Sequence, residues 1–310
     1  MSDTASPGQY RCGFIALIGR PNVGKSTLLN TLVGEKLAIV TPKPQTTRTR
    51  LIGVKTLSQA QLIFVDTPGI HSHAGSLLNR RMVELALGAL QETDAVLFLV
   101  DAQRGIVDGD EKIAARLSGL STPVIGVVNK IDLLPRPALL PVLDRLAGLL
   151  SGREVVPVSA LHDTNTAELL STLLQPLPVG PALYPSDELT DQSERMLAQE
   201  MIREQLFFNT QQEIPYATAA VIEEFTERPD KSLLVVRAAI HVERASQKAI
   251  VIGRGGTRLK KIGQAARWRL EAFFGCKVFL ELFVKVSKGW TNRPGMLHEL
   301  GLSDVSTRRA

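Results

Sequence analysis

The chain has 310 residues, a formal net charge of +5 and 44% hydrophobic residues. This length suggests about two domains, and because no run reaches about 18 apolar residues we expect no membrane-spanning helix. The first eight residues lack the basic start and apolar core of a signal peptide, so we expect none. Cys12 and Cys276 are the only cysteines, which favours a reducing cytoplasm over a disulfide framework.

The N-terminal half alternates short apolar runs with helical patterns. Such alternation predicts an α/β fold with a mostly parallel, doubly wound sheet. The expected strands cover residues 12–18, 37–40, 51–55, 62–65, 95–100, 124–128 and 155–158. The expected helices begin at residue 27 and cover residues 77–90, 110–117, 139–150 and 166–174.

A phosphate-binding loop follows the first expected strand. Residues 19–26 read GRPNVGKS and fit the pattern G-x-x-x-x-G-K-S, with a helical pattern directly after them. Backbone amides of such a loop bind a polyanion, while Lys25 reaches the terminal phosphates and Ser26 ligates Mg²⁺. The residues predicted to contact the nucleotide here are Gly19, Arg20, Pro21, Asn22, Val23, Gly24, Lys25, Ser26 and Thr27.

Three further strands end in polar motifs, which predicts a common site at the carboxyl edge of the sheet. Asp66 is expected in the Mg²⁺ shell and the Gly69 amide at the γ-phosphate. Asp132 can accept hydrogen bonds from the N1–H and 2-amino groups of guanine, which adenine lacks, so the expected ligand is GTP or GDP. The amides of the third motif are expected at guanine O6. The three motifs are Asp66, Thr67, Pro68, Gly69 and Ile70, then Asn129, Lys130, Ile131 and Asp132, then Ser159 and Ala160.

Residues 11–174 resemble the translation-factor-like class of small GTPases, and the segments Pro21-Asn22 and Gln45-Thr-Thr-Arg48 resemble its bacterial Era family. The resemblance implies that a switch I threonine, Thr47 or else Thr46, closes on Mg²⁺ in the GTP state. It also implies that Asn22 helps to hold K⁺ beside the phosphates.

The position after Gly69 is Ile70, where Ras-like enzymes carry a glutamine, so another group must orient the attacking water or hydrolysis must await a partner or ion. The residues expected to act in hydrolysis are Lys25, Thr47, Asp66 and Gly69.

The C-terminal third predicts a different, α+β arrangement. Its expected order is helix 189–208, strand 215–225, strand 232–243, helix 247–252, a glycine loop at 253–256, helix 258–274 and strand 277–286. A GXXG loop between two helices in this order resembles the type II KH domain, which binds RNA.

Eight basic residues and no acidic residue lie between Arg244 and Leu270, which is the charge pattern of a phosphate-binding surface. Trp268 could stack on a base, but its neighbours predict that it packs beside the core. The expected RNA contacts are Lys248, Gly253, Arg254, Gly255, Gly256, Arg258, Lys260, Lys261 and Arg267.

A GTPase domain followed by a type II KH domain is the layout of the Era family. The resemblance implies binding to small-subunit ribosomal RNA near its 3′ end, a GTP-controlled role in maturation of the small ribosomal subunit, and a monomer that is cytoplasmic or peripheral on the inner membrane. The expected segments are a flexible N-terminus (1–10), a GTPase domain (11–175), a linker (176–190), a KH domain (191–290) and a tail (291–310).

Two alternatives remain open. In one, the GTPase acts through protein or membrane partners and the KH fold is a scaffold. In the other, the chain is an accessory GTPase of RNA modification, although that class normally carries different flanking domains.

Overall fold

The computed structural model describes residues 10–69, 76–228, 230 and 232–302. These residues form two compact units. The first contains residues 10–38, 50–69 and 82–191, and the second contains residues 39–49, 76–81 and 192–302. The expected flexible N-terminus therefore lies outside the described residues, apart from its last residue, Tyr10.

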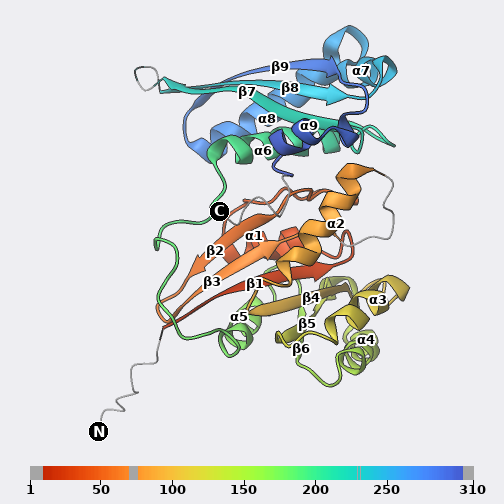
Figure 1. The fold of residues 1–310 in the computed structure, drawn as a ribbon, viewed down its shortest axis with the longest axis vertical. Coiled ribbons are helices and arrows are strands. Elements are labelled where there is room, and N and C mark those ends of the chain that lie inside the picture. The colour runs from red at the N-terminus through yellow and green to blue at the C-terminus, as the bar shows by residue number, and fades with distance from the viewer. Residues whose placement is uncertain (1–9, 70–75, 229, 231, 303–310) are drawn as a thin grey trace. The chain divides into compact units, whose positions relative to one another are not determined.

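The first unit is built on a six-stranded sheet in the order β2-β3-β1-β4-β5-β6 (Figure 1). All neighbours are parallel except β2 and β3, which are antiparallel. This arrangement confirms the expected doubly wound, mostly parallel sheet. Because the strands are parallel, their carboxyl ends, where the polar motifs follow, lie at one edge of the sheet. The strands are β1 (Arg11–Gly19), β2 (Leu51–Thr56), β3 (Ala60–Asp66), β4 (Ala95–Asp101), β5 (Val124–Asn129) and β6 (Val155–Val158).

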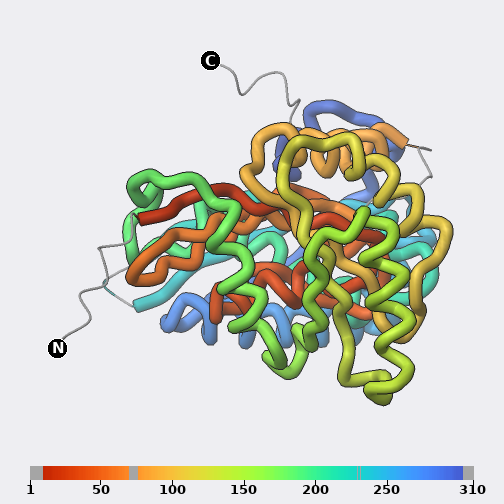
Figure 2. Tube along the Cα trace, turned by 90° about the horizontal axis from the view of Figure 1, so that it is seen from below, coloured from red at the N-terminus to blue at the C-terminus, as the bar shows by residue number. Residues whose placement is uncertain are grey.

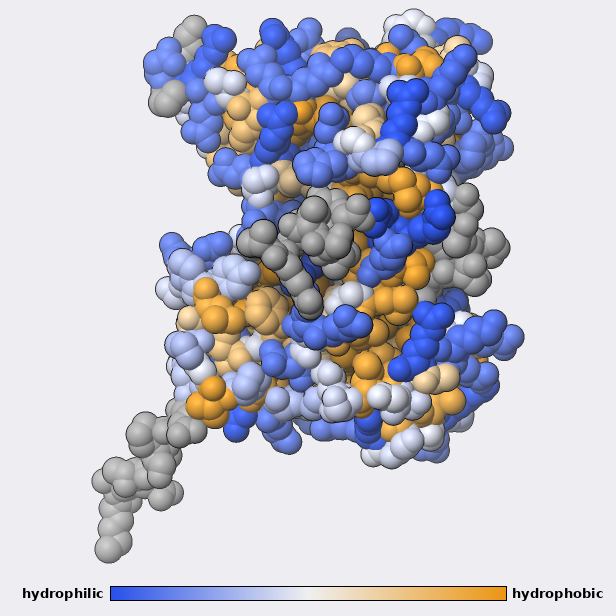
Figure 3. All heavy atoms as spheres, viewed as in Figure 1, coloured by the Kyte–Doolittle hydropathy of each residue, from blue (hydrophilic) through white to orange (hydrophobic). Residues whose placement is uncertain are grey.

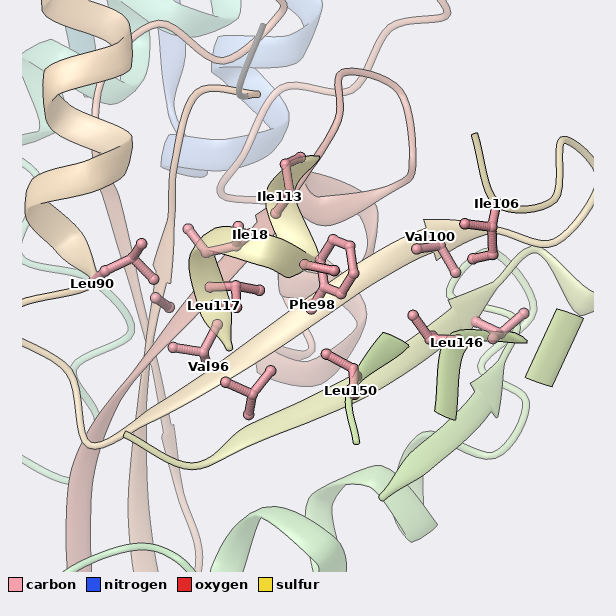
Figure 4. Close-up of a cluster of buried hydrophobic side chains, with 14 of the residues drawn as sticks. Ile18, Leu90, Val96, Phe98, Val100, Ile106, Ile113, Leu117, Leu146 and Leu150 are labelled. Atoms are coloured by element: carbon pink, nitrogen blue, oxygen red, sulfur yellow. The ribbon is translucent and has the colours of Figure 1, made fainter. Parts of the chain in front are cut away.

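Apolar side chains from both sheet and helices form the core of this unit. Figure 4 shows Phe98 of β4 among side chains from the helices, including Leu117 and Leu146. Helices α3 and α4 lie side by side over this part of the sheet (Figures 1 and 2). The helices are α1 (Lys25–Val33), α2 (Leu77–Ala89), of which residues 82–89 belong to this unit, α3 (Asp108–Leu117), α4 (Arg136–Leu149) and α5 (Thr166–Leu174), with a short 3₁₀ turn, η1 (Ile131–Leu133).

The strand expected at residues 37–40 is wrong. These residues have no regular structure, although Leu37, Ala38 and Ile39 are buried. The side chain of Asn30 on α1 donates to the Ala38 carbonyl at 2.9 Å and accepts from the Ala38 amide at 2.8 Å. The Asn30 amide thus satisfies the backbone groups that a neighbouring strand would otherwise pair, so burial does not require a strand.

A buried glutamine is one of the residues that hold the expected linker against the first unit. Gln61 on β3 accepts from the amides of Leu183 and Tyr184 at 2.8 and 2.9 Å and donates to the Tyr184 carbonyl at 2.8 Å. Further on, the Leu189 carbonyl accepts from Val54 of the edge strand β2 at 2.8 Å. The segment therefore follows a defined path over the sheet.

The second unit has a three-stranded sheet in the order β7-β8-β9, in which β8 is antiparallel to β7 and parallel to β9. Helices α6 and α8 pack on each other, α6 against β7 and α8 against β9 (Figure 1). The elements are α6 (Glu194–Asn209), β7 (Thr218–Arg228), β8 (Leu233–Val242), α7 (Ala245–Ile252), η3 (Arg254–Gly256), α8 (Thr257–Phe274), β9 (Lys277–Val286), η4 (Trp290–Asn292) and α9 (Pro294–Glu299).

Two expected boundaries in this unit are corrected. Helix α6 begins at Glu194 and not at residue 189, because the Ser193 side chain caps it by accepting from the Met196 amide at 3.3 Å. The expected tail contains η4 and α9, and Leu297 and Leu302 are buried, so residues 291–302 contribute to the packing of the unit.

Among the described residues, no helix has the length and apolarity needed to cross a membrane. On the face shown in Figure 3, hydrophilic residues cover most of the second unit, with smaller hydrophobic areas between them.

Replacing Phe98 with alanine should destabilise the first unit by about 3–5 kcal/mol, because the cavity left in a fully buried cluster cannot be refilled. Thermal and urea denaturation would measure the loss. Leu140→Ala on α4, whose side chain is 63% exposed, is the control and should change stability by less than about 0.5 kcal/mol. Equal effects of the two changes would contradict this description of the core.

Candidate functional site

The loop between β1 and α1 packs closely against the side chain of Asn129. Gly24, the residue before α1, has a φ of +103°, and a Cβ atom there would lie 2.2 Å from Nδ2 of Asn129. Both observations require glycine at this position. The loop therefore brings its backbone amides and the N-terminus of α1 to the carboxyl edge of the sheet, where an anion would be bound.

Lys25 is buried inside this loop. Its Nζ donates to the carbonyls of Gly19 and Arg20 at 3.0 and 3.1 Å. Burial lowers the pKa of Lys25 to about 8, and the nearby carboxylate of Asp66 opposes this shift. A positive charge so poorly solvated gains strongly from a phosphate ligand, because the ligand replaces the hydration that burial removed.

A hydroxyl and a carboxylate meet beside this lysine. Ser26 Oγ donates to Asp66 Oδ2 at 2.6 Å, and Asp66 is fully buried at the end of β3. Both are oxygen ligands of the kind that Mg²⁺ prefers, so the pair fits this ion. The adjoining Thr67 is structural, since its hydroxyl donates to the Leu17 carbonyl at 3.0 Å.

Gly69 lies directly against the phosphate-binding loop. A Cβ atom at this position would be 2.7 Å from the backbone nitrogen of Pro21, so only glycine fits. Its amide is thereby kept close to the loop, as expected for a group that meets the γ-phosphate. Ile70, the position without a glutamine, lies outside the described residues.

Two side chains at the end of β5 join the loops of the site. Asn129 donates to the Val23 carbonyl at 2.9 Å and accepts from the Ala160 amide at 3.0 Å. Lys130 donates to the Asn22 carbonyl at 2.8 Å and forms an ion pair of 2.6 Å with Asp101. The polar motifs at the ends of β5 and β6 and the phosphate-binding loop thus belong to one hydrogen-bonded network.

Asp132 presents its carboxylate next to this network. Ser159 Oγ donates to its Oδ1 at 2.5 Å, and His162 Nε2 lies 3.8 Å from its Oδ2. The two amides expected at guanine O6 donate within the protein here, Ser159 to the Thr164 carbonyl at 3.1 Å and Ala160 to Asn129. A contact with the base therefore requires these amides to share or exchange their present acceptors.

Sequence reasoning missed three polar residues of this region. They are Asp101, which pairs with Lys130, His162, which lies beside Asp132, and Asp110, whose fully buried carboxylate accepts from Arg20 Nε at 2.8 Å. Asp101 ends β4 as Asp66 ends β3, so its position in the sequence was a usable signal. Asp110 and His162 carried no such signal, because their partners, Arg20 and Asp132, are distant in sequence.

Thr47 lies in a segment that belongs to the second unit, whereas Ser26 and Asp66 belong to the first. Thr46 and Arg48, the residues on either side of Thr47, are bound within the second unit through buried guanidinium groups. The Arg203 guanidinium donates to the Thr46 carbonyl, and Arg48 donates to the Thr218, Pro215 and Tyr216 carbonyls at 2.7, 3.0 and 3.1 Å.

Arg48 is only 5% exposed, and burial lowers its pKa to about 9. Its guanidinium also lies over the ring of Trp290, 5.8 Å from the centroid. Because a buried charge is costly unless fully hydrogen-bonded, these contacts define the position of residues 46–48 in the second unit.

The glycine loop between α7 and α8 is open on its outer side. Gly255 and Gly256 have φ values of +57° and +76°, and a Cβ atom at either position would meet no atom within 4 Å. Gly253 differs, since a Cβ atom there would lie 2.8 Å from Cβ of Arg258. Gly255 and Gly256 thus leave free space in front of the backbone, as close approach of a nucleic-acid backbone requires.

A groove of about 550 Å³ runs beside this loop, between α8 and β9. Two of the expected basic contacts, Lys260 and Arg267, lie along it, while Arg258 donates to the Ile250 carbonyl at 2.5 Å and thereby links α8 to α7. The expectation that Trp268 packs beside the core is wrong, because 59% of it is exposed. The groove is lined by Gly256, Leu259, Lys260, Gly263, Gln264, Arg267, Leu280 and Leu282.

The remaining expected contacts, Lys248, Arg254 and Lys261, are not among the lining residues; Arg254 and Lys261 are exposed and Lys248 is half-buried. The lining residues Gln264, Leu280 and Leu282 were not expected. The sequence around them predicts an amphipathic helix and a strand. It does not show that this helix and this strand pack beside each other to form a groove.

Comparisons with known proteins agree with both halves of this description. Residues 14–130 match the family model of a 50S ribosome-binding GTPase, and residues 213–291 match that of a KH domain. The chain is 47% identical over 293 residues to GTPase Era of Geotalea daltonii, covering 94% of this chain and 98% of the relative. It is 48% identical over 299 residues to GTPase Era of Geobacter metallireducens, covering 96% and 99%.

Two solved structures are similar over the whole fold. One is Era in complex with a magnesium-bound GTP analogue and nucleotides 1506–1542 of 16S ribosomal RNA, with a TM-score of 0.92 and 42% identity. The other is a variant of Aquifex aeolicus Era bound to GDP and aluminium fluoride, with a TM-score of 0.91 and 42% identity. Each comparison covers 95% of this chain and 100% of the other.

The low pKa of Lys25 predicts that GTP affinity falls as the pH rises above about 8. Below that pH the free protein already carries the charge, whereas above it binding must take up a proton, because phosphates favour the ammonium form. Calorimetry at pH 8.5 in two buffers of different ionisation enthalpy would measure this uptake. Constant affinity between pH 7 and 9.5 without proton uptake would contradict the assignment.

Proposed function

The chain belongs to the Era family of GTPases, and we propose that it couples GTP binding and hydrolysis to the capture of small-subunit ribosomal RNA near its 3′ end. Through this coupling it would assist maturation of the small ribosomal subunit. The observation that supports the proposal most strongly is that one chain carries two features. One is a hydrogen-bonded network that joins Asn129 to the phosphate-binding loop beside the Asp132 carboxylate, and the other is an open glycine loop beside a groove lined by Lys260 and Arg267.

In the nucleotide site, Lys25 binds the terminal phosphates and Asp132 accepts from the guanine edge. Ser26 and Asp66 hold Mg²⁺, which when bound neutralises charge on the phosphates. The Gly69 amide meets the γ-phosphate, and the close approach of Gly69 to Pro21 in the phosphate-binding loop supports this role. Asn129 and Lys130 keep the loop in its binding shape before the ligand arrives.

Two further roles are part of this proposal. Thr47 completes the Mg²⁺ shell in the GTP state, and Asn22 contributes to a K⁺ site that adds positive charge beside the phosphates. The K⁺ site compensates for the missing glutamine at position 70, because an isoleucine side chain cannot orient water.

The second unit is proposed to bind single-stranded RNA along α8. The positive φ values and free space at Gly255 and Gly256 suit close contact with the RNA backbone. Lys260 and Arg267 supply charge along the groove, and Leu280 and Leu282 supply an apolar wall against which bases can pack. The Era structure with 16S ribosomal RNA supports this choice of nucleic acid.

We propose that the segment of residues 39–49 links the two activities. It carries Thr47, a predicted ligand of Mg²⁺, yet its neighbours Thr46 and Arg48 are bound by the second unit. A ligand that draws Thr47 to the ion would therefore alter contacts of the RNA-binding unit. By linkage, RNA must then change the affinity for GTP by the same factor.

Replacing Asp132 with asparagine should weaken GTP binding about 100-fold or more and favour xanthosine triphosphate. The amide nitrogen would face the 2-amino group donor against donor, so one hydrogen bond is lost and the bond from N1–H no longer goes to a charged group. Xanthine carries an acceptor oxygen at this position and matches the amide. Competition between the two nucleotides for the variant would measure the switch. Undiminished GTP affinity would remove Asp132 from the base-reading role.

The double change Arg254→Asp and Gly255→Asp should abolish RNA binding without altering GTP affinity. The new carboxylates would repel phosphates, and a side chain at Gly255 would occupy the free space in front of the loop. Fluorescence anisotropy with a labelled single-stranded RNA of the 16S 3′ end would measure the loss. Arg104→Asp, at an exposed position of the first unit, is the control for added negative charge.

Unchanged RNA affinity in the double variant would reject the glycine loop as the contact. If the unmodified protein binds no RNA but binds a protein or an anionic vesicle, the second unit is a scaffold for another partner, and the RNA proposal fails.

A further inference from the structure

Trp268 is a large aromatic side chain on the surface of α8 that the glycine loop and the groove do not account for. It is 59% exposed, and among the described residues none of the close aromatic-ring or cation–ring contacts involves it. The neighbouring Arg269 is engaged elsewhere, over the ring of Phe273. The indole face of Trp268 is therefore available to a ligand.

The position of Trp268 is continuous with the groove. Gln264 lines the groove and lies one helical turn before Trp268, so the two side chains are neighbours on the helix surface. Arg267, the adjacent residue, also lines the groove. Because side chains on a helix lean towards its N-terminus, the indole covers the turn that carries Gln264, on the side of the glycine loop.

The surroundings of the indole favour a nucleobase as its occupant. Lys261 lies two helical turns before Trp268 on the same side of α8 and is exposed, so it attracts phosphates to this surface, while the charge of Arg267 is shared with Glu271 at 4.0 Å. Every base has a flat aromatic face, and stacking on tryptophan needs no particular hydrogen-bond pattern. A partner with charged phosphates and flat bases satisfies both features of this surface.

We propose that Trp268 stacks on an unpaired base of the RNA and extends the binding site beyond the groove. Gly256 and Trp268 are twelve residues apart on α8, which corresponds to about 18 Å along the helix axis. The loop and groove hold about four nucleotides in a KH domain. Trp268 then lies at the far end and holds the nucleotide that leaves the groove. This inference rests on the proposed binding of RNA.

The chain allows a direct optical test, because it has only two tryptophans. Trp290 is fully buried, and its Nε1 donates to the Ala217 carbonyl at 3.0 Å, so RNA cannot stack on it or shield it from a quencher. Trp268 is the exposed one. Titration of the full-length protein with the single-stranded 16S 3′-end RNA should quench its emission and protect it from acrylamide.

The variant Trp268→Phe separates the two signals, since it leaves only Trp290. In this variant the RNA-induced quenching should disappear, while RNA binding measured by anisotropy weakens only slightly because phenylalanine can still stack. Trp268→Ala should weaken binding about 5- to 150-fold, the range expected for loss of one base–aromatic contact. The slope of affinity against salt should not change, because no charge is removed.

A matched aromatic control lies on β9. Phe279 is 50% exposed, and it neighbours Leu280, which lines the groove. Successive side chains of a strand point to opposite faces, so Phe279 faces away from the groove. Phe279→Ala should leave both RNA affinity and the quenching of Trp268 unchanged.

Shortening the RNA gives a second readout. An oligomer of four nucleotides that only fills the groove should bind the unmodified protein and Trp268→Ala equally, whereas longer oligomers should distinguish them. If the protein binds the RNA with unchanged Trp268 emission and Trp268→Ala binds it equally well, the stacking inference is overturned and the groove proposal stands. Quenching by anionic vesicles but not by RNA would assign Trp268 to a membrane, and absence of any RNA binding would overturn both proposals.

Discussion

The buried side-chain amide of Asn129 is the interaction on which the nucleotide site depends. It joins the end of β5 to the phosphate-binding loop through Val23 and to the loop after β6 through Ala160. Each buried amide group left without a partner would cost about 1–3 kcal/mol, so the three segments have a strong preference for one arrangement. Gly24 follows from the same constraint, because any side chain there would collide with this amide.

Lys130 and Arg20 extend this arrangement with charged pairs. Lys130 joins the loop to Asp101 on β4, and Arg20 joins it to the fully buried Asp110 on α3. The loop is thereby fixed from two sides before a ligand binds. Lys25, in contrast, donates only to backbone carbonyls of its own loop among the described residues, and the Asp66 carboxylate lies nearby, so it can turn towards phosphates without breaking a side-chain pair.

Much of the fold and of the nucleotide site could be predicted from the sequence, because local patterns determine them. Apolar runs followed by polar motifs located the parallel strands, and the glycine pattern located both loops. The error at residues 37–40 arose because the side chain of Asn30 pairs with the backbone there and removes the need for a strand. The two amides expected at the base donate to Asn129 and to the Thr164 carbonyl in this structure, and their contact with the base stays a prediction.

The surface of the second unit was less predictable for a similar reason. Basic residues are visible in a sequence, but the groove depends on how α8 packs against β9, which brings Leu280 and Leu282 opposite Gly263 and Gln264. The exposure of Trp268 could have been predicted from helix periodicity, since it lies about 160° around α8 from the centre of the buried face formed by Ile262, Ala266 and Leu270.

The central claim is that one chain uses GTP to control an RNA-binding site. The most direct test is to measure the affinity of the full-length protein for single-stranded 16S 3′-end RNA with a non-hydrolysable GTP analogue, with GDP and without nucleotide. We predict affinities that differ between the nucleotide states, and a reciprocal change of the same factor in nucleotide affinity when RNA is present. Equal RNA affinity in all three states would contradict the account and leave two independent binding units on one chain.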